Sequence, residues 1–179
     1  MTEPAIVLIG PMGAGKSSVG RRLAKALAVA FYDSDAAVVR SHGPIDALFA
    51  DHGEEHFRAL EREAVHAGLV GGGVVALGGG AILHPETRSE LAGLRVVLLT
   101  VAPERVAGRL GGSRRPLLAG EDPVARWRAV YAERRELYEQ LADLTIDTST
   151  GPLQDVVDAI AAWAREGGSP RVPATEGDA

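Results

Sequence analysis

The sequence predicts an α/β fold in which helices cover both faces of a parallel sheet. Short apolar runs rich in β-branched residues alternate along the chain with longer segments whose apolar residues recur at helical spacing. Such alternation favours a parallel sheet. The first apolar run also leads directly into a glycine-rich motif that opens a helix, an arrangement typical of the carboxyl edge of these sheets.

The individual elements follow from these patterns and from capping residues. The apolar runs expected as strands of a five-stranded sheet lie at residues 5–9, 29–32, 74–77, 95–101 and 144–147. The segments expected as helices lie at residues 18–27, 36–40, 45–50, 54–69, 85–91, 104–110, 123–141 and 153–165. Pro103 and Pro123 suit first helical positions, and Asp122 can cap the helix that follows it. Gly53 is expected to end one helix before the next begins.

We expect residues 1–166 to form one domain, because the chain of 179 residues is long enough for a single core. Residues 167–179 are rich in Gly, Pro, Ser and acidic residues, and we expect them to form a disordered tail.

Composition restricts the class of protein. The chain lacks cysteine, so a disulfide framework and thiolate metal sites are excluded. Its net charge of −5 argues against a general nucleic-acid binder. The chain shows no apolar run long enough to span a bilayer and no pattern of a secretory signal. We therefore expect a soluble cytoplasmic protein without a nucleic-acid or membrane partner. We also expect it to be a monomer.

The glycine-rich motif is the most specific feature of the chain. Residues Gly10–Ser17 read Gly-Pro-Met-Gly-Ala-Gly-Lys-Ser and match the pattern of a P-loop. The backbone N–H groups of such a loop surround phosphate oxygens, and the start of the following helix adds partial positive charge. Lys16 can reach the β- and γ-phosphates of ATP, and the Ser17 hydroxyl can bind Mg²⁺. The residues expected around the phosphates are Gly13, Ala14, Gly15, Lys16, Ser17 and Ser18.

Two aspartates follow the second predicted strand. In an extended segment Asp33 and Asp35 would project to the same side, because side chains alternate along a strand. One carboxylate could then support Mg²⁺ while the other orients and deprotonates an attacking hydroxyl group. The alternative is that either aspartate merely caps the next helix.

Gly78, Gly79 and Gly80 follow the third predicted strand. Since the carboxyl ends of parallel strands meet at one edge of the sheet, these glycines are expected beside the P-loop and the two aspartates. There they would let a substrate lie against bare backbone. The alternative is an ordinary loop.

Arginines mark a candidate lid over the phosphates. Arg109, Arg114 and Arg115 lie in or next to residues 111–121, a polar, glycine-rich segment that we expect to be mobile and to close over ATP. The alternative is an ordinary solvated loop. For Arg58 and Arg134, spacing alone indicates no more than surface arginines.

Several classes of site and protein are excluded. The chain has no asparagine and therefore lacks the Asn-Lys-x-Asp segment that usually gives guanine specificity in Ras-like GTPases. An oligomeric ATPase motor usually has an acidic residue at the end of a strand, and the third and fourth predicted strands lack one. The five histidines show no metal-ligand spacing.

The ordered set of motifs resembles the shikimate kinase family. The motifs that carry the resemblance, which covers about residues 5–162, are Gly10–Ser17, Asp33-Ser34-Asp35, Phe57-Arg58, Gly78-Gly79-Gly80, Arg115-Pro116-Leu117-Leu118, Arg134 and Leu137-Tyr138. The resemblance implies a P-loop kinase fold similar to that of nucleoside-monophosphate kinases. It also implies ATP- and Mg²⁺-dependent phosphorylation of the 3-hydroxyl group of shikimate, in aromatic amino-acid biosynthesis.

The resemblance further implies roles for single residues. Lys16 and Ser17 would serve ATP and Mg²⁺, and Asp33 would support the metal through water. Asp35 would bind the hydroxyl groups of shikimate, Arg58 and Arg134 its carboxylate, while Gly79 and Gly80 line the site. In the lid, Arg115 would reach phosphate, and Arg109 would contact adenine. Where many relatives carry an adenine-side arginine after Thr148, this chain continues with Ser149, which implies weaker ATP binding.

Two other functions remain open at this point. A related small-molecule kinase, for example one that acts on gluconate, would share the P-loop and the lid. A non-catalytic module that senses ATP would share the P-loop alone.

Overall fold

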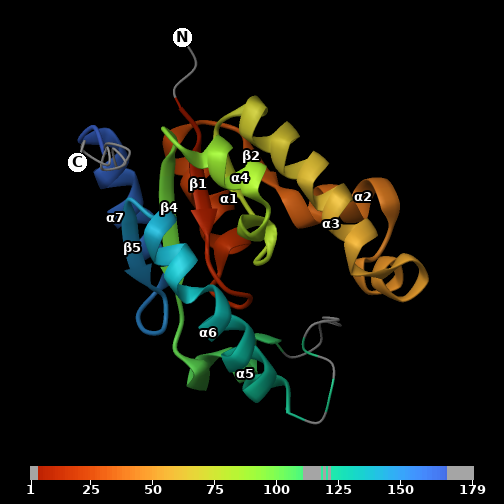
Figure 1. The fold of residues 1–179 in the computed structure, drawn as a ribbon. Coiled ribbons are helices and arrows are strands. Elements are labelled where there is room, and N and C mark those ends of the chain that lie inside the picture. Colours follow the sequence, from red (N-terminus) through yellow and green to blue (C-terminus); the bar gives the residue numbers. More distant parts are fainter. Residues whose placement is uncertain (1–3, 111–117, 119, 121, 169–179) are drawn as a thin grey trace, which may run out of the picture.

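The computed structural model describes residues 4–110, 118, 120 and 122–168. The strands are β1 (Ile6–Ile9), β2 (Phe31–Asp33), β3 (Val74–Ala76), β4 (Arg95–Thr100) and β5 (Leu144–Asp147). The α-helices are α1 (Lys16–Leu27), α2 (Ser34–His42), α3 (Ile45–Gly71), α4 (Pro85–Leu91), α5 (Pro103–Leu110), α6 (Pro123–Leu141) and α7 (Leu153–Arg165) (Figure 1). A short 3₁₀ helix, η1 (Ala81–Leu83), precedes α4.

The predicted parallel sheet is confirmed. Its strand order is β2-β3-β1-β4-β5, and every neighbouring pair is parallel. The P-loop thus leaves the central strand β1, the segment after β3 leaves the neighbouring strand, and the segment after β2 leaves the edge strand beyond it. All of these segments emerge at the carboxyl edge of the sheet.

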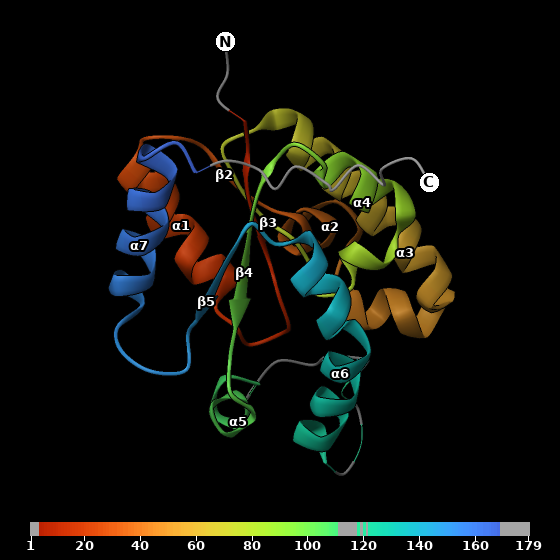
Figure 2. The same ribbon diagram turned by 60° about the vertical axis from the view of Figure 1, so that its left-hand side comes forward.

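Alternate residues of the strands enter two separate cores. On β1, Ile6 and Leu8 pack in the core beneath α1 and α7, whereas Val7 and Ile9 pack in the core beneath α3, α4 and the second half of α6. Figure 2 shows these two groups of helices on opposite sides of the sheet. Because both faces are buried, β1 is apolar throughout rather than alternating.

A smaller core joins α2 to α3. Val38, Leu48 and Phe57 are its buried members. The backbone of α3 breaks at Gly53, where φ is 82°, so the predicted interruption appears as a kink within one helix. The kink separates the part of α3 that covers α2 from the part that crosses the sheet (Figure 1).

Most predicted boundaries agree with the structure, and the differences are local. The second strand lies later than expected, at Phe31–Asp33, and α2 begins at once with Ser34. The short helix η1, which follows the triple glycine, was not predicted. Among the described residues, no helix is both long and apolar enough to cross a membrane. Most of the candidate lid and residues 169–179 of the predicted tail lie outside the described residues.

Candidate active site

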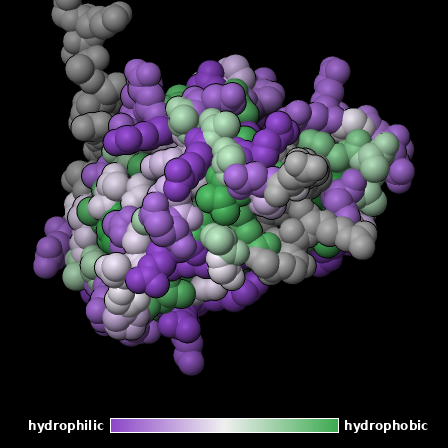
Figure 3. Space-filling model, turned by 90° about the horizontal axis from the view of Figure 1, so that it is seen from below, coloured by the Kyte–Doolittle hydropathy of each residue, from purple (hydrophilic) through white to green (hydrophobic). Residues whose placement is uncertain are grey.

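The site lies at the edge of the sheet where the parallel strands end. A pocket of about 440 Å³ opens at this edge. On this side of the molecule, a band of hydrophobic residues runs between hydrophilic ones (Figure 3). Many of the predicted site residues line the pocket: Gly13, Gly15, Lys16, Ser17, Ser18, Asp33, Asp35, Gly79 and Arg109. The predicted nucleotide and metal groups therefore share one space with Asp35 and Gly79 of the predicted acceptor groups. Arg58 and Gly80 line a second pocket, of about 480 Å³, instead.

Side chains hold every backbone carbonyl of the P-loop from Gly10 to Ala14. Lys16 Nζ donates to the carbonyl groups of Gly10 and Pro11, at 2.8 and 2.9 Å. The next carbonyls accept from distant residues: Met12 from Trp127 Nε1 at 2.8 Å, Gly13 from Arg109 Nη1 at 3.0 Å, and Ala14 from Thr148 Oγ1 at 2.8 Å. The C=O and N–H groups of a trans peptide point in opposite directions. The N–H groups of the loop therefore point away from the side chains that hold its carbonyl groups. Apart from the Ala14 N–H, which donates to the Pro11 carbonyl at 3.3 Å, they are then available to surround an anion.

Glycine is required at two points of the P-loop. Gly15 has a φ of 92°, a left-handed conformation that side chains disfavour, and it directly precedes α1. A Cβ atom at Gly10 would lie 2.2 Å from the carbonyl oxygen of Leu99 on β4. The loop therefore crosses the sheet edge in direct backbone contact and delivers the amino terminus of α1 to the pocket, where its partial positive charge favours phosphate.

Asp33 combines the two roles that the sequence left as alternatives. Its Oδ1 accepts a hydrogen bond from the Ala36 N–H at 3.0 Å and so caps α2. Its Oδ2 accepts from Ser17 Oγ at 2.5 Å. A hydroxyl and a carboxylate are the hard oxygen donors that Mg²⁺ prefers, and Mg²⁺ usually takes few protein ligands beside phosphate and water. Within the described part of the chain, no group of three or more His, Cys, Asp or Glu residues could hold a metal alone. The pair fits an ion shared with a nucleotide.

Asp35 faces the pocket for a different reason from the one expected. The assignment of both aspartates to an extended segment is wrong, because α2 begins at Ser34 and Asp35 lies in its first turn. The two carboxylates still line the same pocket, since Asp33 stands just before the helix and Asp35 just inside it.

The triple glycine makes room for protein side chains as well as for a ligand. A Cβ atom on Gly78 would lie 2.4 Å from Asp35 Oδ1, and one on Gly80 would lie 2.2 Å from Arg58 Nη1. A Cβ atom on Gly79 would meet nothing closer than 3.6 Å. A side chain at Gly78 or Gly80 would therefore displace the charged side chain packed against it, whereas one at Gly79 would make only ordinary contacts.

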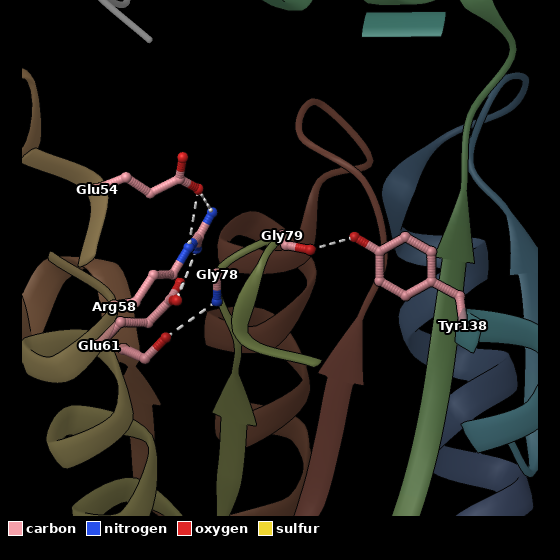
Figure 4. A network of polar contacts seen from close by, with 7 residues as sticks. Glu54, Arg58, Glu61, Gly78, Gly79 and Tyr138 are labelled. Atoms are coloured by element: carbon pink, nitrogen blue, oxygen red, sulfur yellow. Dashed lines mark hydrogen bonds and ion pairs between the residues drawn. The ribbon is translucent and has the colours of Figure 1, made fainter. Parts of the chain in front are cut away.

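A glutamate lies on each side of Arg58. Arg58 Nη1 donates to Glu61 Oε2 at 2.7 Å, while Nε and Nη2 donate to Glu54 Oε1 at 3.3 and 3.1 Å (Figure 4). The side chain of Glu61 is 4% exposed and that of Glu54 is 53% exposed. One edge of the guanidinium group is thus fixed by a buried partner, and the other meets an exposed partner that a ligand could displace.

Glu61 is the buried centre of this group of charges. Burial raises the pKa of Glu61, and the Asp35 carboxylate acts in the same direction. Arg58 and Arg134 oppose this shift and favour the ionised form. Both arginines therefore act on one carboxylate, although they belong to α3 and α6.

We expect Glu61→Gln to preserve stability at neutral pH and to weaken binding of the acceptor. Because the folded state raises the pKa of Glu61, folding favours its protonated form, and this contribution to stability is lost as pH rises from about 4.5 through the folded pKa. Glutamine mimics the protonated form, so its advantage over the wild type should be largest at neutral pH and should vanish in acid. Thermal melts at several pH values check the stability.

Binding of the acceptor should fall because a neutral amide holds Arg58 less firmly than a carboxylate does. Calorimetry checks this part of the prediction. Glu54→Gln is the matched control, since it removes the exposed partner of the same arginine and should not weaken acceptor binding. A lower melting temperature for Glu61→Gln at every pH would show instead that the ionised carboxylate stabilises the fold.

Arg134 is 7% exposed and is not the surface arginine that spacing alone indicated. Its guanidinium group hydrogen-bonds to the hydroxyl of Tyr138, one turn further along α6. That hydroxyl in turn donates to the carbonyl group of Gly79 (Figure 4). Burial raises the pKa of Tyr138 to about 12, so the hydroxyl remains a donor at neutral pH. Arg58 thus packs directly against the glycine segment, and Arg134 is linked to it through Tyr138.

Arg109 joins the P-loop to the end of β5. Besides its bond to Gly13, its Nη1 donates to Thr148 Oγ1 at 3.1 Å and its Nη2 to the Thr148 carbonyl at 2.6 Å. It lines the same pocket as the P-loop. Arg114 and Arg115, the other two arginines of the candidate lid, lie outside the described residues.

Several residues that hold the site together were not predicted from the sequence. Glu61 could have been found, because it interrupts the buried face of α3 between Phe57 and Val65, where an apolar residue is normal. Trp127 and Thr148 had no local pattern, since their P-loop partners lie 115 and 134 residues away.

Comparisons with known proteins agree on one family. The family model described as "Shikimate kinase" matches residues 12–165. The chain is similar to a shikimate kinase of Mycobacterium avium, with 48% identity over 82% of this chain and 85% of the relative. It is also similar to a shikimate kinase of Thermobifida fusca, with 48% identity over 89% of this chain and 94% of the relative. Among solved structures, it resembles a shikimate kinase of Acinetobacter baumannii in complex with shikimate, with a TM-score of 0.87 and 36% identity over 92% of this chain and 94% of that one.

Proposed function

The chain belongs to the shikimate kinase family, and from this premise we propose that it transfers the γ-phosphoryl group of ATP to the 3-hydroxyl group of shikimate. Members of this family are ATP-dependent kinases. The observation that carries the proposal for this chain is the common pocket, in which Lys16 and Ser17 of the P-loop face the same space as Asp35 and Gly79. The phosphate donor and the hydroxyl acceptor can therefore lie next to each other in one pocket.

ATP would bind with its phosphates on the P-loop. The N–H groups of Gly13, Ala14 and Gly15 would surround the phosphate oxygens, together with the first N–H groups of α1. Ser17 would bind Mg²⁺, and Asp33 would support the ion directly or through water. When bound, the ion neutralises phosphate charge and aligns the β- and γ-phosphates. Arg109 would lie on the adenine side, and Arg115 would reach the phosphates from the lid.

Asp33→Asn is expected to weaken the dependence of ATP binding on Mg²⁺ while α2 stays capped. Asparagine keeps a side-chain oxygen for the Ala36 N–H but loses the charge that the metal prefers. Asp33→Ala loses both and should also lower the free energy of unfolding by about 1 kcal/mol. Calorimetric titration of an ATP analogue at several Mg²⁺ concentrations, with urea unfolding, separates the two effects. If Asp33→Asn keeps the Mg²⁺ dependence of the wild type, Asp33 has no metal role.

Shikimate would bind across the glycine segment. Its carboxylate fits the Nε–Nη2 edge of Arg58, where it would replace the exposed Glu54, and it would also meet Arg134. The backbone of Gly79 and Gly80 would line the ring, and Asp35 would accept hydrogen bonds from the hydroxyl groups. This orientation directs the 3-hydroxyl group toward the P-loop.

The transfer itself needs little covalent chemistry from the protein. The 3-oxygen of shikimate attacks the γ-phosphorus, its proton passes to the Asp35 carboxylate, and the bond between the γ-phosphorus and the bridging oxygen breaks to release ADP. Lys16 and Arg115 would stabilise the negative charge that spreads over the transferring group. Positioning and charge neutralisation supply most of the rate enhancement.

A coupled assay of ADP release tests the proposal against its rivals. Shikimate should stimulate ADP release, whereas gluconate and other hydroxy acids should not. Stimulation by gluconate instead would identify a gluconate kinase. ATP binding without turnover on any acceptor would identify an ATP-sensing module.

We also propose that residues 1–166 form one domain that acts as a monomer in the cytoplasm, with residues 111–121 as a lid and residues 167–179 as a tail. The composition of the two segments supports these proposals. Analytical ultracentrifugation tests the monomer, and protection from proteolysis by an ATP analogue plus shikimate tests the lid.

A further inference from the structure

The glycine segment after β3 is hydrogen-bonded to side chains on both sides. On one side, the Gly78 N–H donates to Ser34 Oγ at 3.0 Å. On the other side, the Tyr138 hydroxyl donates to the Gly79 carbonyl. Ser34 is fully buried and Tyr138 is 1% exposed, so water competes with neither bond. The two bonds connect α2, the end of β3 and α6 (Figure 4).

The bond to Ser34 continues the hydrogen-bond pattern between β2 and β3 beyond the last backbone pair. The last backbone pair between β2 and β3 joins Asp33 to Ala76. Ser34 already belongs to α2, and its hydroxyl takes over as the acceptor for Gly78. Since Ser34 stands between Asp33 and Asp35, this bond fixes the two carboxylates relative to the glycine segment. The close fit of Asp35 against Gly78 shows how little freedom remains there.

The bond to Tyr138 sets the direction of a peptide plane. The Gly79 carbonyl and the Gly80 N–H belong to one trans peptide and point in opposite directions. Tyr138 draws the carbonyl toward α6, so the Gly80 N–H points away from α6. The Gly78 carbonyl accepts from the Ala81 N–H at 3.1 Å, which orients the Gly79 N–H in the same manner. Within the described part of the chain, neither the Gly79 nor the Gly80 N–H donates to another residue.

We propose that the Ser34 and Tyr138 hydroxyl groups are positioning residues for the acceptor, because they hold the Gly79 and Gly80 N–H groups in place between Asp35 and the two arginines. The inference rests on the proposed function, since it names what orients the acceptor site. Arg134 strengthens the arrangement, because its guanidinium group donates to the Tyr138 oxygen and so polarises the hydroxyl toward Gly79. Ser34 and Tyr138 themselves need not touch the acceptor.

Tyr138→Phe and Ser34→Ala test the inference, each by removing one hydroxyl group. A lost neutral hydrogen bond corresponds to an effect of about three- to tenfold. We expect the Kd and KM for shikimate to rise by that factor in each variant, while the Kd of an ATP analogue and the KM for ATP stay unchanged. A residue with a merely structural role would lower the melting temperature without this split between the two substrates.

Tyr131→Phe is the matched control. It removes a hydroxyl group from the same helix, on a ring that lies between those of Trp127 and Tyr138 in the sequence of ring contacts. Among the described residues, no hydrogen bond joins that hydroxyl to the glycine segment. It should bind shikimate like the wild type. Amide exchange adds a readout that does not depend on substrate, because the Gly78 N–H should exchange faster in Ser34→Ala but not in Tyr131→Phe.

The outcomes separate this inference from the proposed function. If the wild type neither binds nor phosphorylates shikimate, both are overturned. If the wild type is active and both variants bind shikimate as it does, this inference alone is overturned. Should Tyr138→Phe fail to fold, Ser34→Ala and the exchange of the Gly78 amide decide the question.

Discussion

Lys16→Ala is expected to reduce turnover at least about a hundredfold while the protein stays folded. The substitution removes the charge that would meet the β- and γ-phosphates as negative charge develops on the transferring group. In the structure the ammonium group donates to the Gly10 and Pro11 carbonyls, so its loss also removes two hydrogen bonds within the loop. The rest of the P-loop keeps its anchors from Trp127 and Thr148. Initial rates, with circular dichroism as a check of folding, measure the effect.

Lys25→Ala is the control for Lys16→Ala. Lys25 is the only other lysine of the chain, and it lies exposed in the last turn of the same helix. Its removal should leave turnover unchanged. Near wild-type turnover in folded Lys16→Ala protein would disprove the catalytic role of the P-loop lysine.

Arg58→Ala is expected to weaken shikimate binding by about 2–5 kcal/mol, the range for removing one partner of a desolvated charge pair. The change removes the group that would hold the carboxylate and leaves Glu61 buried without its closest cation, at 2.7 Å. Arg134→Ala should have a similar effect, because Arg134 is buried beside the same segment. Binding of ATP alone should barely change. Calorimetric titration of shikimate and of ATP into each variant measures both affinities.

Two further variants sharpen the result for the arginines. Arg58→Lys should also be impaired, because a lysine cannot present one edge to Glu61 and the other to a carboxylate. Arg135→Ala, next to Arg134 but with its side chain 65% exposed, should bind shikimate like the wild type. Unchanged shikimate affinity in both Arg58→Ala and Arg134→Ala would show that the acceptor site lies elsewhere.

The fold was largely predictable because its rules are local. Apolar runs, proline at first helical positions and the aspartate cap of α6 each depend on a few neighbouring residues, and the structure has them as predicted. The start of α2 was not predictable in this way. Ser34 and Asp35 read equally well as the end of a strand or the first turn of a helix, and the cap made by Asp33 decides between them.

The part of the site that consecutive residues form could be predicted from the sequence. The part that depends on contacts between distant residues could not. The P-loop needs only consecutive residues, so its place at the sheet edge follows from the strand before it. Arg134 looked ordinary because nothing nearby in the sequence shows that Tyr138 links it to Gly79, on another element. Glu61 was overlooked because it acts by holding Arg58 and does not itself line the P-loop pocket.

The distant anchors of the P-loop have a consequence for the order of folding. The loop is made within the first tenth of the chain, but three of its carbonyls take partners from Arg109, Trp127 and Thr148. A nascent chain that ends before Thr148 lacks the last of these partners, however well its first strand and helix have formed. Since contacts of such separation are slow to close, we expect the P-loop to reach its final geometry only late in synthesis.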